Sequence, residues 1–226
     1  MQTKRALVLC FAAFPFLSLS VLAGGREFGR VPRPLTAMES LAEDAYDHAL
    51  AGQPDRVGTD ARGVDGKWRL FRAQAARDGA RSADLAEIDT AVADLLHRAT
   101  GGSAEQVGLA RAANRISGVM DELFGLYRPP VPPALNELDF LGREVVLNAM
   151  EAKFHEAADD VMSIRSTWLT MKDAVLAAGG RTDADSFEAS LAAIDQAIAA
   201  ENGVQLIARA NANLELVDRL EKLFSR

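Results

Sequence analysis

The sequence VPRPL at residues 31–35 returns as VPPAL at residues 131–135, one hundred positions later. The same offset brings the only two tryptophans, Trp68 and Trp168, into register, and matched glycines follow eleven residues after each of them. Self-similarity at a fixed period is typical of tandem repeats. The sequence therefore predicts a duplicated unit of about 95 residues, and a chance agreement between two helical patterns is the alternative.

Each copy has the pattern of four amphipathic helices. In the first copy we expect helices over 39–51, 56–77, 82–98 and 104–127, separated by Gly and Pro residues that interrupt helices. At the end of the second copy, apolar residues recur every three or four positions over 206–224, which is the spacing of one helix face. No stretch alternates as a half-buried strand does. The predicted fold class is all-α, a tandem duplication of a four-helix unit that forms two helical bundles or one eight-helix array.

The first 23 residues have the three parts of a secretory signal peptide, because a basic start at Lys4 and Arg5 precedes an apolar run and a small residue at the end. An uncleaved membrane anchor is the alternative, since the run over 6–23 is about 18 residues long, near the lower limit for a span. The proline and serines in the run favour cleavage. We therefore expect a periplasmic or secreted protein with no membrane span after cleavage. Cys10, the only cysteine, lies in this segment, so the mature chain would have no disulfide and no thiol site.

The segments that follow the signal peptide are defined by their prolines. We expect an extended leader over 24–34, helical repeat 1 over 35–128, a proline-rich linker over 129–134, and helical repeat 2 over 135–226. Consecutive prolines favour a stiff polyproline II conformation, so the linker would act as a spacer between the two copies.

The motifs and the charge of the sequence indicate a binding or adaptor protein without enzymatic activity. Nucleic-acid-binding proteins usually carry an excess of basic residues, whereas this chain has a net charge of −7. The catalytic and nucleotide-binding motifs GxSxG, HExxH, GxxxxGK[ST] and GxGxxG are absent from the sequence.

The hairpin of the third and fourth helices of each copy resembles those of periplasmic b-type and c′-type cytochrome bundles in its apolar spacing. The final helix has no His and the chain has no CxxCH, so no haem is expected. The expected partner is a protein or a small cationic ligand. A holdase-like stress protein is one alternative, because the first helix of the second copy is unusually apolar.

A periplasmic divalent-metal-binding protein is the other alternative. On a helix that continues through residue 155, Glu144, Glu151 and His155 would share one narrow ridge, with Glu151 and His155 one turn apart. In the first copy, Asp44 and His48 have the same spacing. Carboxylate and imidazole groups so spaced can share a divalent ion. The competing interpretation is that the ridge is only the solvated edge of an apolar helix.

Overall fold

The computed structural model describes residues 31–101, 105–127, 129 and 131–225, and within these residues it contains eight α-helices and no strand. The all-α prediction is therefore confirmed for this part of the chain. The helices are α1 (Arg33–Leu50), α2 (Pro54–Asp78), α3 (Ser82–Thr100), α4 (Gln106–Gly125), α5 (Pro133–Met150), α6 (Phe154–Ala177), α7 (Arg181–Ala199) and α8 (Gly203–Phe224). Among the described residues, no helix has both the length and the hydrophobicity that a membrane span needs. The predicted signal peptide lies outside the described residues.

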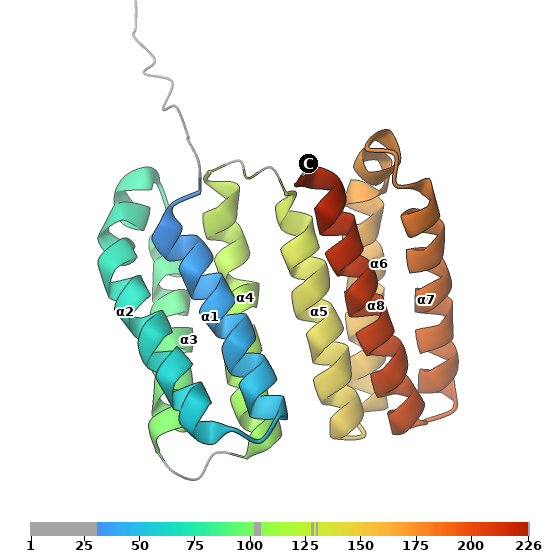
Figure 1. The fold of residues 1–226 in the computed structure, drawn as a ribbon, viewed down its shortest axis with the longest axis horizontal. Helices are drawn as coiled ribbons and strands as arrows, with labels where there is room; N and C mark the ends of the chain where they lie inside the picture. The colour runs from blue at the N-terminus through green and yellow to red at the C-terminus, as the bar shows by residue number, and fades with distance from the viewer. Residues whose placement is uncertain (1–30, 102–104, 128, 130, 226) are drawn as a thin grey trace, which may run out of the picture.

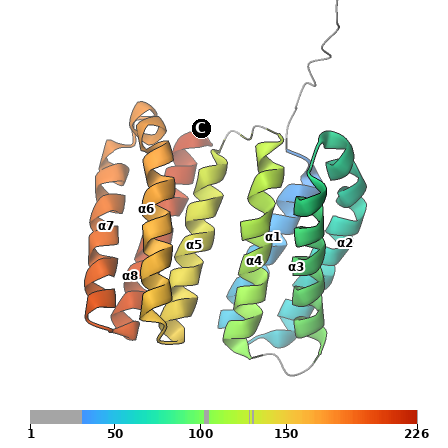
Figure 2. The same cartoon turned by 180° about the vertical axis from the view of Figure 1, so that it is seen from behind.

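The helices form two groups of four that stand side by side (Figure 1). In the first group, called here the N-terminal bundle, α1 packs against α2 and α4, and α3 packs against α2 and α4. In the second group, the C-terminal bundle, α5 packs against α6 and α8, and α7 closes the ring. The two bundles meet where α4 packs against α5 (Figure 2).

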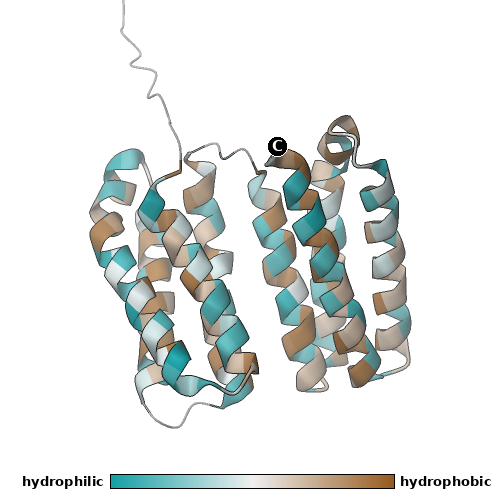
Figure 3. Cartoon of the chain, in the orientation of Figure 1, coloured by the Kyte–Doolittle hydropathy of each residue, from teal (hydrophilic) through white to brown (hydrophobic). Residues whose placement is uncertain are grey.

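Each bundle has its own hydrophobic core. Apolar and polar residues alternate along the helices in Figure 3, as expected for helices that bury one face. Phe71 and Ile88 are fully buried in the N-terminal core, and Phe187 and Ile194 in the C-terminal core, each 0–1% exposed. Burying a side chain of this size stabilises the fold by about 1.5–3 kcal/mol. Leu147 of α5 belongs to the core of the N-terminal bundle, so the C-terminal bundle is anchored in its neighbour.

The first helix of each bundle begins within the segment expected to be extended. Helix α1 starts at Arg33 and α5 starts at Pro133, with a proline in the first turn of each. A proline is tolerated there because the first backbone N–H groups of a helix have no intrahelical acceptor. The expected start of the first helix at Glu39 was therefore too late by six residues.

Helix boundaries repeat with nearly the offset of the sequence. Helices α1 and α5 cover equivalent residues one hundred positions apart, and α2 and α6 also begin one hundred positions apart. Trp68 Nε1 donates to Asp89 at 2.7 Å, while Trp168 Nε1 donates to Glu188 at 3.0 Å. The two bundles thus share internal contacts as well as helix lengths, and an evolutionary duplication stays a prediction.

Candidate functional site

The packing of α4 on α5 depends on a glycine. A Cβ atom on Gly118 would lie 2.8 Å from the ring of Phe140, closer than carbon atoms approach in folded proteins. Beside this contact, the amide of the fully buried Asn114 donates to the Phe140 carbonyl at 3.0 Å and to Glu144 Oε1 at 2.8 Å. The close approach and the buried hydrogen bonds hold the two bundles together.

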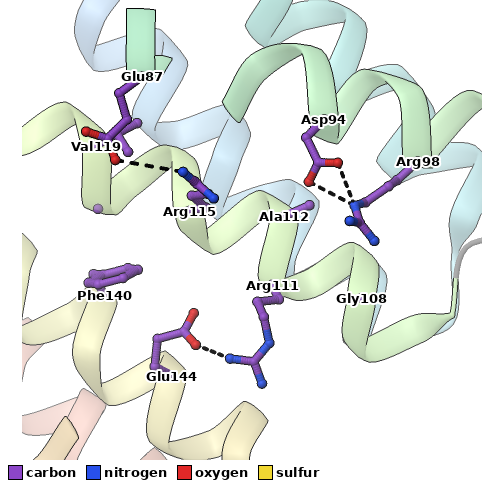
Figure 4. A pocket seen from close by; sticks show the side chains of 11 residues that line it. Glu87, Asp94, Arg98, Gly108, Arg111, Ala112, Arg115, Val119, Phe140 and Glu144 are labelled. Atoms are coloured by element: carbon purple, nitrogen blue, oxygen red, sulfur yellow. Dashed lines mark hydrogen bonds and ion pairs between the residues drawn. The ribbon is translucent and has the colours of Figure 1, made fainter. Parts of the chain in front are cut away.

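Arg111 of α4 contacts polar side chains at and just beyond α5 (Figure 4 shows its contact with Glu144). Its guanidinium donates to Glu144, to Asn148 Oδ1 at 3.1 Å and to Glu151 Oε2 at 2.6 Å. Arg111 and Glu144 line a pocket of about 560 Å³ between α3, α4 and α5 (Figure 4). The other two arginines of the pocket also face carboxylates, Arg98 at 2.8 Å from Asp94 and Arg115 at 3.8 Å from Glu87. Because the charges are matched within the chain, this pocket does not favour a charged ligand.

The five residues predicted to bind a metal do not come together. Glu144 and Glu151 hold Arg111, as described above. Asp44 is exposed on α1, and His48 Nδ1 lies 2.7 Å from Asp60 Oδ2 of α2. The ring of His48 is thus used in joining the first two helices.

The expected continuous helix through His155 is wrong. Helix α5 ends at Met150 and α6 begins at Phe154, because Ala152 adopts a left-handed backbone conformation with φ of 57° and turns the chain. Glu151 and His155 are therefore not neighbours on one helix face, and the side chain of His155 is 89% exposed. Within the described residues, no group of three or more His, Cys, Asp or Glu side chains could hold a metal ion.

Four carboxyl groups gather instead where α1, α4, α5 and α8 face one another, here called the junction. Glu39 of α1 and Asp121 of α4 form the N-terminal carboxyl pair, and Asp139 of α5 and Glu221 of α8 form the C-terminal carboxyl pair. The members of the two pairs occupy positions one hundred residues apart. Figure 1 shows α1 and α8 on the viewer's side of this junction.

Burial raises the pKa of all four carboxyl groups, because water no longer stabilises the charged form. The pKa of Asp121 rises to about 8, with Glu39 and Glu137 adding to the effect of burial, and the pKa of Glu39 rises to about 7, with Glu43 adding. In the C-terminal pair, burial raises the pKa of Glu221 to about 7 and that of Asp139 to about 6. The junction thus favours the neutral, protonated form of these carboxyl groups.

Arg143 of α5 is the cation that faces these carboxyl groups. Its side chain is 11% exposed, and its guanidinium lies 2.5 Å from Asp139 and 3.0 Å from Glu43. It also stacks over the ring of Tyr46, 5.2 Å from the ring centre. Arg143 therefore forms an ion pair with one carboxyl group of the junction, Asp139, and it also favours the charged forms of Glu39 and Glu221.

Several buried polar atoms of the junction lack partners. Seven buried side-chain polar atoms of the described residues make no hydrogen bond, and five of them belong to the carboxyl groups, to Arg143 or to residues beside them. These five are Glu39 Oε2, Tyr46 Oη, Ser117 Oγ, Asp121 Oδ1 and Arg143 Nη1. Buried polar atoms in folded proteins nearly always have a partner, so such a concentration marks a place that suits a polar ligand.

The comparisons with known proteins give no relative from which to transfer a function: no family model, no curated protein and no solved structure matches this chain.

The junction was missed at the level of sequence although a signal for it exists. Glu39 aligns with Asp139, and Asp121 aligns with Glu221, at the same offset as the tryptophans. Acidic residues repeated on helices with an apolar face are a detectable pattern. That α1, α4, α5 and α8 bring them to one place depends on how the two bundles pack, which helix periodicity does not determine.

Proposed function

We propose that this chain is an exported, non-enzymatic binding protein that binds a small organic cation at the junction of two duplicated helical bundles. One observation carries the proposal: four partly buried carboxyl groups lie at the junction, and a single guanidinium, that of Arg143, interacts with only three of them. Arg143 cannot compensate all of them, because its ion pairs are with Asp139 and Glu43. A cationic ligand would supply the missing positive charge in surroundings where water screens poorly, so its attraction would be stronger than at an exposed surface.

The duplication is supported by the repeated architecture. The turn between the first two helices of each bundle makes the same three backbone hydrogen bonds one hundred residues apart, from Gln53 N to His48 O and from Lys153 N to Asn148 O among them. Two copies of one unit, packed through α4 and α5, would bring two copies of one carboxyl pair together.

Titration calorimetry of the purified chain at pH 8 tests the binding function. The probes are the hydrochlorides of n-hexylamine and hexylguanidine, and n-hexanol is the uncharged control. We expect saturable binding of at least one of the cations with one site per chain, and no saturation with the alcohol. If neither cation gives a saturable heat above the buffer blank, the proposed function is wrong.

Export is tested separately. If residues 1–23 act as a cleaved signal peptide, then the full-length gene product recovered from its native host will begin near Gly24 when its N-terminus is sequenced. A product that retains Met1 would contradict the proposed export by a cleaved signal peptide, and it would leave the proposed ligand class unaffected.

A further inference from the structure

Arg143 is a cation enclosed by side chains from both bundles. Its guanidinium forms ion pairs with Asp139, one turn earlier on α5, and with Glu43 of α1. The face of the Tyr46 ring, also from α1, lies beneath it. Carboxylates beside an aromatic face are the groups with which proteins bind guanidinium and other organic cations. The side chains around Arg143 thus have the chemistry of a cation-binding site, and the cation in this site belongs to the chain itself.

The fit of Arg143 to this site is incomplete. Its Nη1 is buried without a hydrogen-bond partner among the described residues, and the hydroxyl group of Tyr46, a residue that is 4% exposed, has no partner there either. Buried polar groups without partners are costly. Arg111, the other arginine that joins the bundles, instead donates to three side chains. A guanidinium that is not attached to α5 is free to turn toward the groups that Arg143 leaves unpaired.

The architecture of a bundle does not require an arginine at this position. The residue equivalent to Arg143 in the N-terminal bundle is Glu43, and α1 nevertheless covers the residues equivalent to those of α5. The carboxylates of the site need a positive charge beside them, because buried charges without a partner are strongly destabilising. That charge does not have to come from the chain.

On these grounds, and resting on the proposed function, we infer that Arg143 is a built-in occupant of the cation site, and that the ligand is an alkylguanidinium that binds Glu43, Tyr46 and Asp139 in competition with it. Two guanidinium groups repel each other where water screens poorly, so the ligand and Arg143 do not share these residues. A planar guanidinium is favoured over an ammonium because it stacks on the ring while it donates to two carboxylates. Binding would also release the tie that Arg143 makes with Glu43.

Arg143→Ala tests the inference on the whole chain at pH 8, with methylguanidine as the probe. Guanidinium compounds ordinarily destabilise folded proteins, so a rise of the Tm with the probe indicates binding to the folded state. We expect millimolar methylguanidine to raise the Tm of this variant and, by titration calorimetry, to bind it at least about tenfold more tightly than the wild type. Methylamine, which has no planar group, should bind the variant about threefold more weakly than methylguanidine.

Arg72 provides the matched control. It is also paired with a carboxylate, that of Asp89, but its side chain is 47% exposed. Arg72→Ala should therefore show no rise of the Tm with methylguanidine. In the Arg143→Ala background, Glu43→Gln should weaken methylguanidine binding about tenfold, because it removes a charged acceptor at a half-exposed position.

Arg143→Gln is a second variant in case Arg143→Ala does not fold, since the amide of glutamine can donate to one of the carboxylates. No binding of methylguanidine to either variant, or equally tight binding to the wild type, would overturn the inference. In the first case, a wild type that still binds hexylguanidine would keep the proposed function without this assignment. If the variants bind methylguanidine and the wild type binds no cation, Arg143 is a permanent occupant, and the proposed function is wrong.

Discussion

The two bundles of this protein have nearly the same helix lengths and carboxyl groups at equivalent positions, but they differ at other equivalent positions. Glu43 in the N-terminal bundle is replaced by Arg143 in the C-terminal bundle, and the two side chains form an ion pair with each other at 3.0 Å. His48 is replaced by Asn148, and each holds the aspartate of its next helix at 2.7 Å. Gly52 is replaced by Ala152 in the same left-handed turn.

The replacement of Glu43 by Arg143 gives the two bundles different electrostatic surroundings at the junction. Arg143 stabilises the charged form of Asp139 and also reaches across the junction to the N-terminal bundle. In the C-terminal bundle, Arg143 thus compensates the negative charge of Asp139, and it also joins the two bundles through Glu43. In the N-terminal bundle, Arg143 favours the charged form of Glu39, whereas the charged groups that shift the pKa of Asp121 are all carboxylates, so the charged form of Asp121 is costly for stability.

The largest expected effect on stability follows from removing the charge of Arg143, which distinguishes the two bundles. Arg143→Met should lower the free energy of unfolding at pH 8 by about 3–5 kcal/mol, because it leaves Asp139 and its neighbours as buried charges without a partner. Glu43→Gln, at the equivalent position, should cost less than about 1 kcal/mol because Glu43 is 45% exposed. Urea denaturation measures both values. Equal losses in the two variants would show that Arg143 has no special role in the junction.

The second effect is a dependence of stability on pH. The pKa values of Glu39 and Asp121 are raised by burial to about 7 and about 8, above their values in the unfolded chain. The folded state therefore binds more protons than the unfolded state between about pH 4 and pH 8, so stability falls as pH rises through this window. Glu43, Arg143 and Asp139 also face Glu39, while Glu137, Glu122 and Asn136 face Asp121, and their charges are part of this balance.

We expect the free energy of unfolding to be lower at pH 8.5 than at pH 5.5 by at least about 3 kcal/mol, which is the contribution of Asp121 alone. Carboxyl groups whose pKa is lowered, such as Asp84 beside Arg81, contribute stability that is lost only at lower pH, so they do not reverse the slope. Asp121→Asn should make the slope shallower. Denaturation curves in a series of buffers test this, and a stability that rises over the same range would contradict it.

The third effect concerns the joint between α4 and α5. Gly118→Ala should lower the free energy of unfolding by about 1–3 kcal/mol, because the new methyl group would collide with Phe140. Gly125→Ala is the matched control on the same helix, since a Cβ there has no neighbour within 4 Å, and it should stabilise the protein by about 0.5–1 kcal/mol. The same urea experiment measures both, and a neutral Gly118→Ala would mean that the bundles are not held by this close contact.

The smallest effect tests whether the two turns are equivalent. Ala152 has φ of 57°, which is strained for a residue with a Cβ, and Gly52 occupies the same turn with φ of 67°. Ala152→Gly should therefore raise the free energy of unfolding by about 0.5–1 kcal/mol, and Gly52→Ala should lower it by a similar amount. Changes of the same sign in both variants would refute the equivalence.

The sequence predicts the helices well because the relevant information is local. Apolar residues spaced by three and four positions define each buried face, and Gly79 and Gly179 mark the helix ends where the backbone turns left-handed. The starts of α1 and α5 were misplaced because Pro34 and Pro133 stop a helix in its interior but are tolerated in its first turn. The break after Met150 was missed because Ala152 lacks the usual preference for a left-handed turn.

The junction is less predictable because it depends on contacts between distant residues. Glu144 of α5 and Glu151, which follows the end of this helix, were predicted to share a ridge, and Arg111 of α4 contacts both of them. Glu39 and Asp121 are 82 residues apart, and their pairing depends on α1 packing against α4. Periodicity identifies the face of a helix, whereas the identity of its neighbour depends on tertiary packing.

The claim that the junction holds partly buried carboxyl groups with raised pKa values is tested most directly by NMR titration of the side-chain carboxyl carbons, with Asp121→Asn to assign the key resonance. We expect Asp121 to titrate near pH 8 and Glu39 near pH 7, and n-hexylamine should shift both midpoints to lower pH, because a bound ammonium favours the charged carboxylate. Midpoints between pH 3 and 5 for both groups, with no response to the amine, would contradict the claim.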